Sequence, residues 1–124
     1  MDKQKIILVA EDDALYASVY QNKLTKEGYG VVIAINGLEA VKKAGELKPD
    51  LILMDLIMPE MDGFTALEKI KSDPATKTIK VVVMSNLGQD SDIKRAKDLG
   101  AEEYFVKANI SIQELMDKVK TYIK

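Results

Sequence analysis

The sequence predicts an α/β domain built on a doubly wound, five-stranded parallel sheet. Five short runs of large apolar residues alternate with segments whose apolar residues recur at helical spacing. The connections between these segments are short, which is typical of a parallel sheet with helices on both faces. The third run, Leu51–Met54, is wholly apolar, as in strands that are buried on both faces.

The first strand and helix have clear ends. Ile6–Ala10 is a continuous apolar run and is expected to be the first strand. Apolar and aromatic residues then recur at helical spacing over Leu15–Leu24, and Asp13 is a natural N-cap for this helix. Gly28 is expected to follow its last turn, where a left-handed conformation favours glycine.

The second unit follows the same plan. Val31–Ile35 is expected to be a strand, and Asn36 and Gly37 form the turn after it. Apolar residues at helical spacing over Leu38–Ala44 indicate a helix that stops before Pro49.

The third and fourth units continue the alternation. Leu51–Met54 is the third strand, and apolar spacing over Phe64–Ile70 indicates the third helix. Ile79–Ser85 is expected to be the fourth strand, and a short fourth helix over Ile93–Leu99 should stop at Gly100.

The last unit consists of a strand over Glu103–Lys107 and a helix over Ile112–Ile123. This strand is less apolar than the others, and we therefore place it at an edge of the sheet. We expect residues 1–124 to form a single domain with no output domain attached.

Composition excludes several classes of function. The chain has no cysteine and no histidine, which excludes disulfides, thiolate metal sites and a phosphohistidine of its own. Its net charge is -2 with both signs interspersed, so no direct binding to nucleic acid or to a membrane is expected. No segment is apolar over the length of a signal peptide or a membrane span. We expect a cytoplasmic monomer.

Reactive side chains stand where four of the five strands end. We expect the first strand to end in Glu11 and Asp12, the third in Asp55, the fourth in Ser85 and the fifth in Lys107. Sites in open parallel sheets form beyond the carboxyl ends of the strands. Three carboxylates at one place disfavour one another's ionisation, and one ammonium is too little to balance them. The pattern therefore predicts a divalent cation, and Mg²⁺ fits best.

A carboxylate beside Mg²⁺, a lysine and a hydroxyl can accept a phosphoryl group. The cation and the ammonium would neutralise charge on the transferring oxygens while Asp55 attacks in line. The product would be an aspartyl phosphate whose oxygens Ser85 and Lys107 could bind.

These residues resemble those of a response-regulator receiver domain of the CheY-like family. The resemblance covers essentially the whole chain and rests on the pair Glu11-Asp12, the Asp55 segment with Met58-Pro59 and Met61-Asp62-Gly63, Ser85, Gly100-Ala101, Tyr104 and Lys107. It implies a flavodoxin-like fold with strand order 2-1-3-4-5. We leave Asp62 out of the site, as a turn or cap residue.

The resemblance also implies roles for these residues. Asp55 would be the phosphoacceptor, and Lys107 would bind the phosphoryl group. Mg²⁺ would be held by Glu11, Asp12, Asp55 and the backbone carbonyl of Ile57. Ser85 and Tyr104 would form the switch. The phosphodonor would be a histidine kinase or a phosphotransfer protein. An unknown downstream protein would read the face formed by the fourth helix, fifth strand and fifth helix. Such a domain is not an enzyme beyond self-phosphorylation and slow self-dephosphorylation.

The chain departs from the family pattern at several positions. Ala108 follows Lys107 where proline after a cis peptide bond is usual. Because a cis bond before a residue other than proline costs about 2.5–4 kcal/mol, we predict a trans bond with a reshaped loop. Asn86 replaces a small residue, which would tighten access for the phosphoryl group. Ile57 and Leu87 are apolar and cannot orient a hydrolytic water, which predicts a long-lived phosphorylated state.

Three other functions deserve comparison. An aspartate-nucleophile phosphatase would need a second acid two residues beyond Asp55, where the chain has Ile57. A flavin- or nucleotide-binding module would need a phosphate loop after the first strand, where the acidic Glu11-Asp12-Asp13 stands instead. A degenerate receiver that binds partners without phosphorylation is the remaining alternative.

Overall fold

The computed structural model describes residues 4–123 and contains one five-stranded parallel sheet in the order β2-β1-β3-β4-β5. The strands are β1 (Ile6–Ala10), β2 (Gly30–Ala34), β3 (Leu51–Met54), β4 (Lys80–Ser85) and β5 (Glu103–Val106). The helices are α1 (Ala14–Lys26), α2 (Gly37–Leu47), α3 (Gly63–Ser72), α4 (Asp90–Asp98) and α5 (Ile112–Tyr122), with a short 3₁₀ turn, η1 (Lys107–Asn109), before α5. The predicted fold class and strand order are confirmed.

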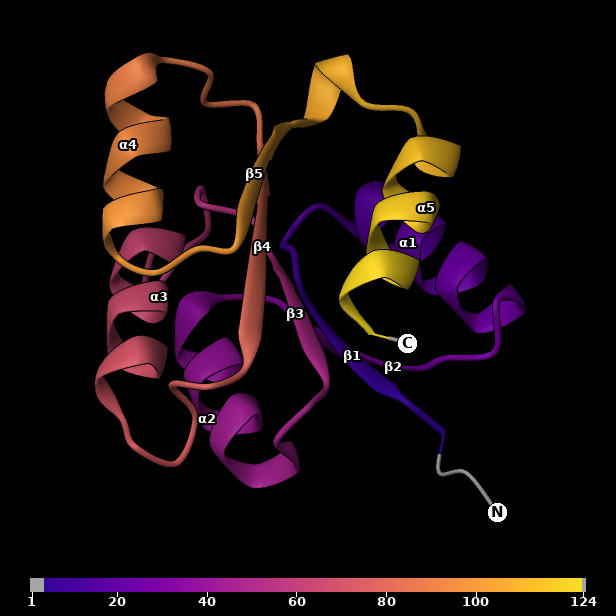
Figure 1. Ribbon diagram of the computed structural model, residues 1–124, viewed down its shortest axis with the longest axis horizontal. Helices are drawn as coiled ribbons and strands as arrows, with labels where there is room; N and C mark the ends of the chain where they lie inside the picture. Colours follow the sequence, from indigo (N-terminus) through magenta and orange to yellow (C-terminus); the bar gives the residue numbers. More distant parts are fainter. Residues whose placement is uncertain (1–3, 124) are drawn as a thin grey trace.

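Helices cover both faces of the sheet (Figure 1). Helices α1 and α5 pack on one face, and α2, α3 and α4 pack on the other. The central strand β3 is fully buried because it receives apolar side chains from both layers. Tyr20 and Leu24 of α1 belong to one core, and Phe64 and Leu67 of α3 belong to the other.

The expected helix ends are present. The Asp13 side chain accepts hydrogen bonds from the backbone N–H groups of Leu15 and Tyr16, which makes it the N-cap of α1. Gly28 follows α1 with φ +96°, a conformation that disfavours residues with a Cβ. Asp62 accepts a hydrogen bond from the backbone of Thr65 and caps α3, as its assignment to a cap predicted.

Glu11, Asp12 and Asp55, which we expected at strand ends, directly follow β1 and β3. Three other residues also lie just outside the strands in which we expected them. The N–H of Ile35 donates to the Glu39 side chain of α2 at 3.1 Å, so β2 ends at Ala34. The N–H of Ile79 closes a turn onto Thr76, so β4 begins one residue later. Lys107 begins the turn η1 instead of ending β5. In these three cases a local hydrogen bond or turn replaces the hydrogen bonding between neighbouring strands.

The register aligns the carboxyl ends of the strands. Ala10 pairs with both Ala34 and Met54, and Met54 pairs with Val83. One strand further along, Ser85 pairs with Val106. The residues that follow these positions therefore meet at one edge of the sheet.

Among residues 4–123, no helix combines the length and the apolar character that crossing a membrane requires.

Candidate functional site

Three carboxylates meet at the carboxyl edge of the sheet. Glu11 and Asp12 follow β1, Asp55 follows β3, and one oxygen of each lies within 4.8 Å of the others. Glu11 and Asp55 are buried, whereas Asp12 is exposed. The first strand and the third are neighbours in the sheet, and this adjacency brings acids 43 or more positions apart in sequence together.

Lys107 supplies a positive charge to this cluster. Its side chain is buried, and its ammonium donates hydrogen bonds to Glu11 and, at 3.1 Å, to Oδ2 of Asp55. Burial lowers the pKa of Lys107, but the bonds to the two carboxylates outweigh it, and the pKa lies above its ordinary value. Lys107 is therefore a protonated, paired cation in the absence of metal.

The surroundings of Glu11 disfavour its ionised form and raise its pKa. Burial raises its pKa from the ordinary 4.5 to about 7, although the hydrogen bond from Lys107 opposes this shift. The negative charge of Asp55 adds to the increase. One ammonium therefore does not fully compensate the buried carboxylates, and an additional cation would favour the ionised form of Glu11.

We expect this shift to make stability depend on pH. Between about pH 4.5 and pH 7 the native protein keeps a proton on Glu11 that the unfolded chain has released. The free energy of unfolding without metal should therefore fall by about 1–3 kcal/mol as the pH rises through this window. Urea unfolding at several pH values measures this change in the free energy of unfolding.

The matched control is Glu11→Gln, which should lose most of this pH dependence. Because a metal ligand must be deprotonated, added Mg²⁺ should stabilise the wild-type protein more at the upper end of the window than at the lower end. An unchanged slope in Glu11→Gln would show that other groups cause the pH dependence.

Ser85 and Tyr104 are joined through the backbone of a third residue. Ser85 is fully buried at the end of β4, and its Oγ accepts a hydrogen bond of 3.2 Å from the N–H of Leu87. The hydroxyl of Tyr104, on β5, donates to the carbonyl of the same Leu87. Burial raises the pKa of Tyr104. The peptide groups of Leu87 thus connect the two predicted switch residues, a link that sequence patterns do not reveal.

The loop after Asp55 is held closely against the site. The N–H of Ile57 donates to Oδ1 of Asp55 at 3.3 Å, and the side chain of Ile57 is 55% exposed. Gly63 begins α3 directly against this loop: a Cβ there would lie 2.2 Å from the carbonyl oxygen of Asp55. Only glycine fits at this contact, which accounts for the Asp62-Gly63 pair.

The peptide bond between Lys107 and Ala108 is trans, as predicted, since residues 4–123 contain no cis peptide bond. The loop after Lys107 forms the turn η1, and this turn accommodates the trans bond. Lys107 reaches Glu11 and Asp55 from this turn.

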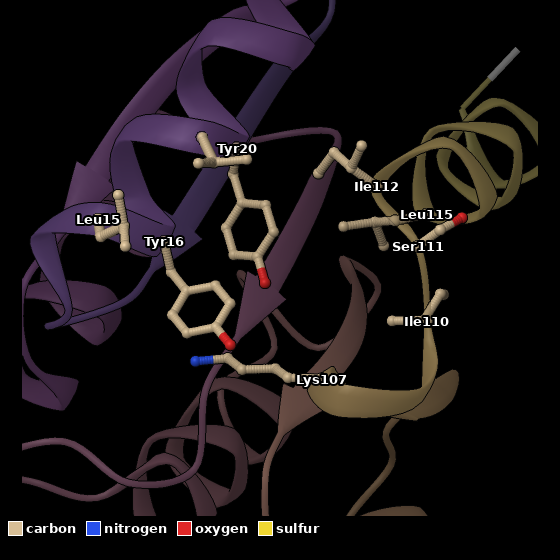
Figure 2. Close-up of a pocket in the computed structure, with 9 residues that line it drawn as sticks. Leu15, Tyr16, Tyr20, Lys107, Ile110, Ser111, Ile112 and Leu115 are labelled. Atoms are coloured by element: carbon tan, nitrogen blue, oxygen red, sulfur yellow. The ribbon is translucent and has the colours of Figure 1, made fainter.

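A cavity of about 320 Å³ adjoins the site between α1 and α5 (Figure 2). Its walls are mostly apolar, with Tyr16, Tyr20 and Lys107 among them. The Lys107 ammonium lies 4.3 Å from the centroid of the Tyr16 ring. Tyr16 was not among the expected site residues. The signal available in the sequence was its place in the first turn of a helix whose cap, Asp13, directly follows the acidic pair Glu11-Asp12.

The donors of the cluster suit Mg²⁺. They are all carboxylate oxygens, as hard divalent cations prefer. Glu11 is penalised by burial and by Asp55, and Asp12 is open to solvent, from which a hydrated ion would enter. Bound there, Mg²⁺ would supply charge neutralisation for phosphoryl oxygens.

The doubly wound sheet carries its acidic, lysine-paired cluster beyond the carboxyl ends of the strands, where α/β domains of this class bind their ligands. Residues 7–120 match the family model "Response regulator receiver domain". The chain belongs to this family, whose members serve phosphorelay signalling in two-component systems and are not classical enzymes. Receiver domains bind Mg²⁺ at an acidic pocket and interact with histidine kinases or phosphotransfer proteins and with downstream targets.

Individual relatives agree with the family assignment. The chain is 37% identical over 121 residues to the chemotaxis protein CheY of Treponema pallidum, covering 95% of this chain and 82% of the relative. It is 32% identical to the DNA-binding dual master transcriptional regulator RpaA of Synechocystis, covering 95% of this chain but only 48% of that regulator. The chain thus spans about half the length of RpaA.

A solved structure has the same fold. The signal receiver domain of a DNA-binding response regulator protein from Colwellia psychrerythraea superposes with a TM-score of 0.88 at 33% identity. The match covers 97% of this chain and 98% of that one.

Proposed function

We propose that Asp55 accepts a phosphoryl group from a phosphohistidine on a histidine kinase or phosphotransfer protein. An Asp55 carboxylate oxygen forms the new bond to phosphorus while the bond from phosphorus to the imidazole nitrogen breaks, and the imidazole takes up a proton. The observation that carries the proposal is the buried carboxylate of Asp55 with a paired ammonium at 3.1 Å. Such a pair can neutralise charge on transferring oxygens.

The remaining site residues have supporting roles in this proposal. Glu11, Asp12, Asp55 and the carbonyl of Ile57 hold Mg²⁺, and Lys107 binds a phosphoryl oxygen once it leaves Glu11. The metal roles are supported by the spacing of the three carboxylates within 4.8 Å.

Ser85 and Tyr104 would turn phosphorylation into a change of surface. When Ser85 Oγ turns to a phosphoryl oxygen, the N–H of Leu87 loses its acceptor. The carbonyl of Leu87, which holds the Tyr104 hydroxyl, then moves with the loop. A few kcal/mol of differential contact is enough to shift such a two-state equilibrium. The downstream protein would read α4, β5 and α5.

A protein donor is supported by exposed apolar side chains on segments that follow β1, β2 and β3 at the carboxyl edge of the sheet. They are Leu15 and Val19 on α1, Ile35 just after β2, Leu38 in the first turn of α2, and Ile57 two residues after Asp55, all of them exposed. An exposed apolar group of this kind is typical of a protein interaction site. The donor would bury these residues as it presents its phosphohistidine to Asp55.

The test is treatment with acetyl phosphate and Mg²⁺, followed by intact-protein mass spectrometry. The wild-type protein should gain one phosphoryl group, and Asp55→Asn should gain none. Beryllofluoride should shift the NMR signals of the β4–α4 loop in the wild-type protein only. A wild-type protein that stays unmodified would favour the degenerate receiver, which binds partners without phosphorylation.

A further inference from the structure

Besides its hydrogen bonds to two carboxylates, Lys107 contacts the aromatic ring of Tyr16. Its ammonium lies 4.3 Å from the centroid of the Tyr16 ring, within the range of about 6 Å in which a cation interacts with an aromatic face. Figure 2 shows the two side chains converging from α1 and from the turn after β5. The side chain of Lys107 is only 4% exposed, so water screens this contact weakly.

The ring of Tyr16 is itself held in place. It stacks on Tyr20 with centroids 5.9 Å apart and an interplanar angle of 29°. Tyr20 is only 5% exposed and belongs to the core between α1 and the sheet. The backbone of Tyr16 is fixed by the Asp13 cap. Contacts within α1 thus hold the Tyr16 ring in its position.

The contact with Tyr16 matters because Lys107 and a bound cation would interact with the same two carboxylates, Glu11 and Asp55. Without metal, Glu11 and Asp55 hold the ammonium. In the proposed function those two carboxylates become metal ligands, so neither is fully available to Lys107. The face of Tyr16 is a contact that a hard cation does not take, because such cations prefer oxygen ligands.

We propose that Tyr16 is a positioning residue: its ring holds the Lys107 ammonium beside Asp55 while Glu11 and Asp55 bind the cation. The inference rests on the proposed function. It also offers a reason why the Lys107 ammonium lies beside Asp55 although Lys107 begins a 3₁₀ turn and a trans peptide bond follows it. Tyr16 is only partly buried and lies between the core and the cavity of about 320 Å³.

The first test measures the contact without metal. Protons on the ε-carbon of Lys107 should show an upfield ring-current shift in the NMR spectrum of the wild-type protein. Tyr16→Phe should keep this shift and Tyr16→Leu should lose it. The matched control is Tyr29→Leu, which removes a half-buried tyrosine immediately before β2 and should leave the Lys107 signals unchanged.

The second test measures phosphorylation by acetyl phosphate at saturating Mg²⁺. Tyr16→Leu should slow the reaction on the order of tenfold, because a partly buried cation–π contact is lost. Tyr16→Phe should stay within about twofold of the wild-type rate, since the aromatic face is preserved. Tyr16→pentafluorophenylalanine keeps the ring's shape but reverses its electrostatic face, and it should be as slow as Tyr16→Leu. The Mg²⁺ dissociation constant should change little in all three variants.

Two results would overturn the inference alone. One is a wild-type rate in Tyr16→Leu or in the pentafluoro variant. The other is an equal loss of rate in Tyr16→Phe, which would assign the effect to the hydroxyl. A wild-type protein that acetyl phosphate does not modify would overturn the proposed function, and the inference with it.

Discussion

Replacing Lys107 by methionine is expected to slow phosphorylation of Asp55 and, at the same time, to tighten Mg²⁺ binding. The ammonium is buried and bonded to Glu11 and Asp55 in the metal-free protein, so it competes with a cation for both carboxylates. Removing it should tighten Mg²⁺ binding by about tenfold, since the competing interaction at such a site is worth a few kcal/mol. Losing its contact with the transferring oxygens should slow the reaction by about 10²–10³-fold.

The two effects are separated by measuring the Mg²⁺ dissociation constant by calorimetry and the acetyl phosphate reaction at saturating Mg²⁺. The matched control is Lys71→Met. Lys71 is also partly buried, but it donates to the backbone carbonyls of Lys77 and Ile79, before β4 and away from the acids. Its loss should leave both quantities unchanged. Weaker Mg²⁺ binding in Lys107→Met would mean that the lysine supports the shape of the site and does not compete for it.

Slower phosphorylation and tighter Mg²⁺ binding in Lys107→Met are expected from structural features that the sequence shows only in part. The positions of Glu11, Asp55 and Lys107 at strand ends could be predicted, because apolar runs mark the strands and parallel strands share a carboxyl edge. Their order across the sheet came from the family resemblance. Periodicity alone does not say that β1 lies between β2 and β3.

Side-chain contacts between separate elements could not be predicted from the sequence. The position of Tyr16 over Lys107 depends on the angle of α1 relative to the turn after β5. The role of Leu87 depends on its backbone, and any residue other than proline has the same backbone groups. The raised pKa of Glu11 depends on how deeply the residue is buried. None of these leaves a mark in residue spacing.

Strand boundaries were missed for a related reason. Ile35 is as apolar as the residues before it, but Glu39 of the next helix captures its N–H. A side chain four positions later therefore ends the strand. Lys107 was assigned to the fifth strand, yet it begins a 3₁₀ turn. In this turn Lys107 still reaches Asp55, at 3.1 Å.

The apolar residues near Asp55 lead to the second large effect, on the lifetime of the phosphorylated protein. Water must attack the phosphorus for the aspartyl phosphate to decay, and a polar side chain nearby can orient that water by hydrogen bonding. Ile57 is 55% exposed beside Asp55, and Leu87 follows β4 at the edge that carries the site. Neither can hydrogen-bond through its side chain. The double variant Ile57→Asn, Leu87→Glu should therefore decay at least about tenfold faster than the wild-type protein.

The decay is followed by mass spectrometry after removal of acetyl phosphate, at constant Mg²⁺. Ile57→Val with Leu87→Met is the matched control, because it changes the shape of both side chains and keeps them apolar. Leu87 packs against the core, so Ile57→Asn alone is needed as well, since Ile57 can change without disturbing that packing. A decay rate that rises little or falls in both polar variants would show that neither side chain limits access or orientation of water. That result would contradict the prediction that apolar side chains at these two positions prolong the phosphorylated state.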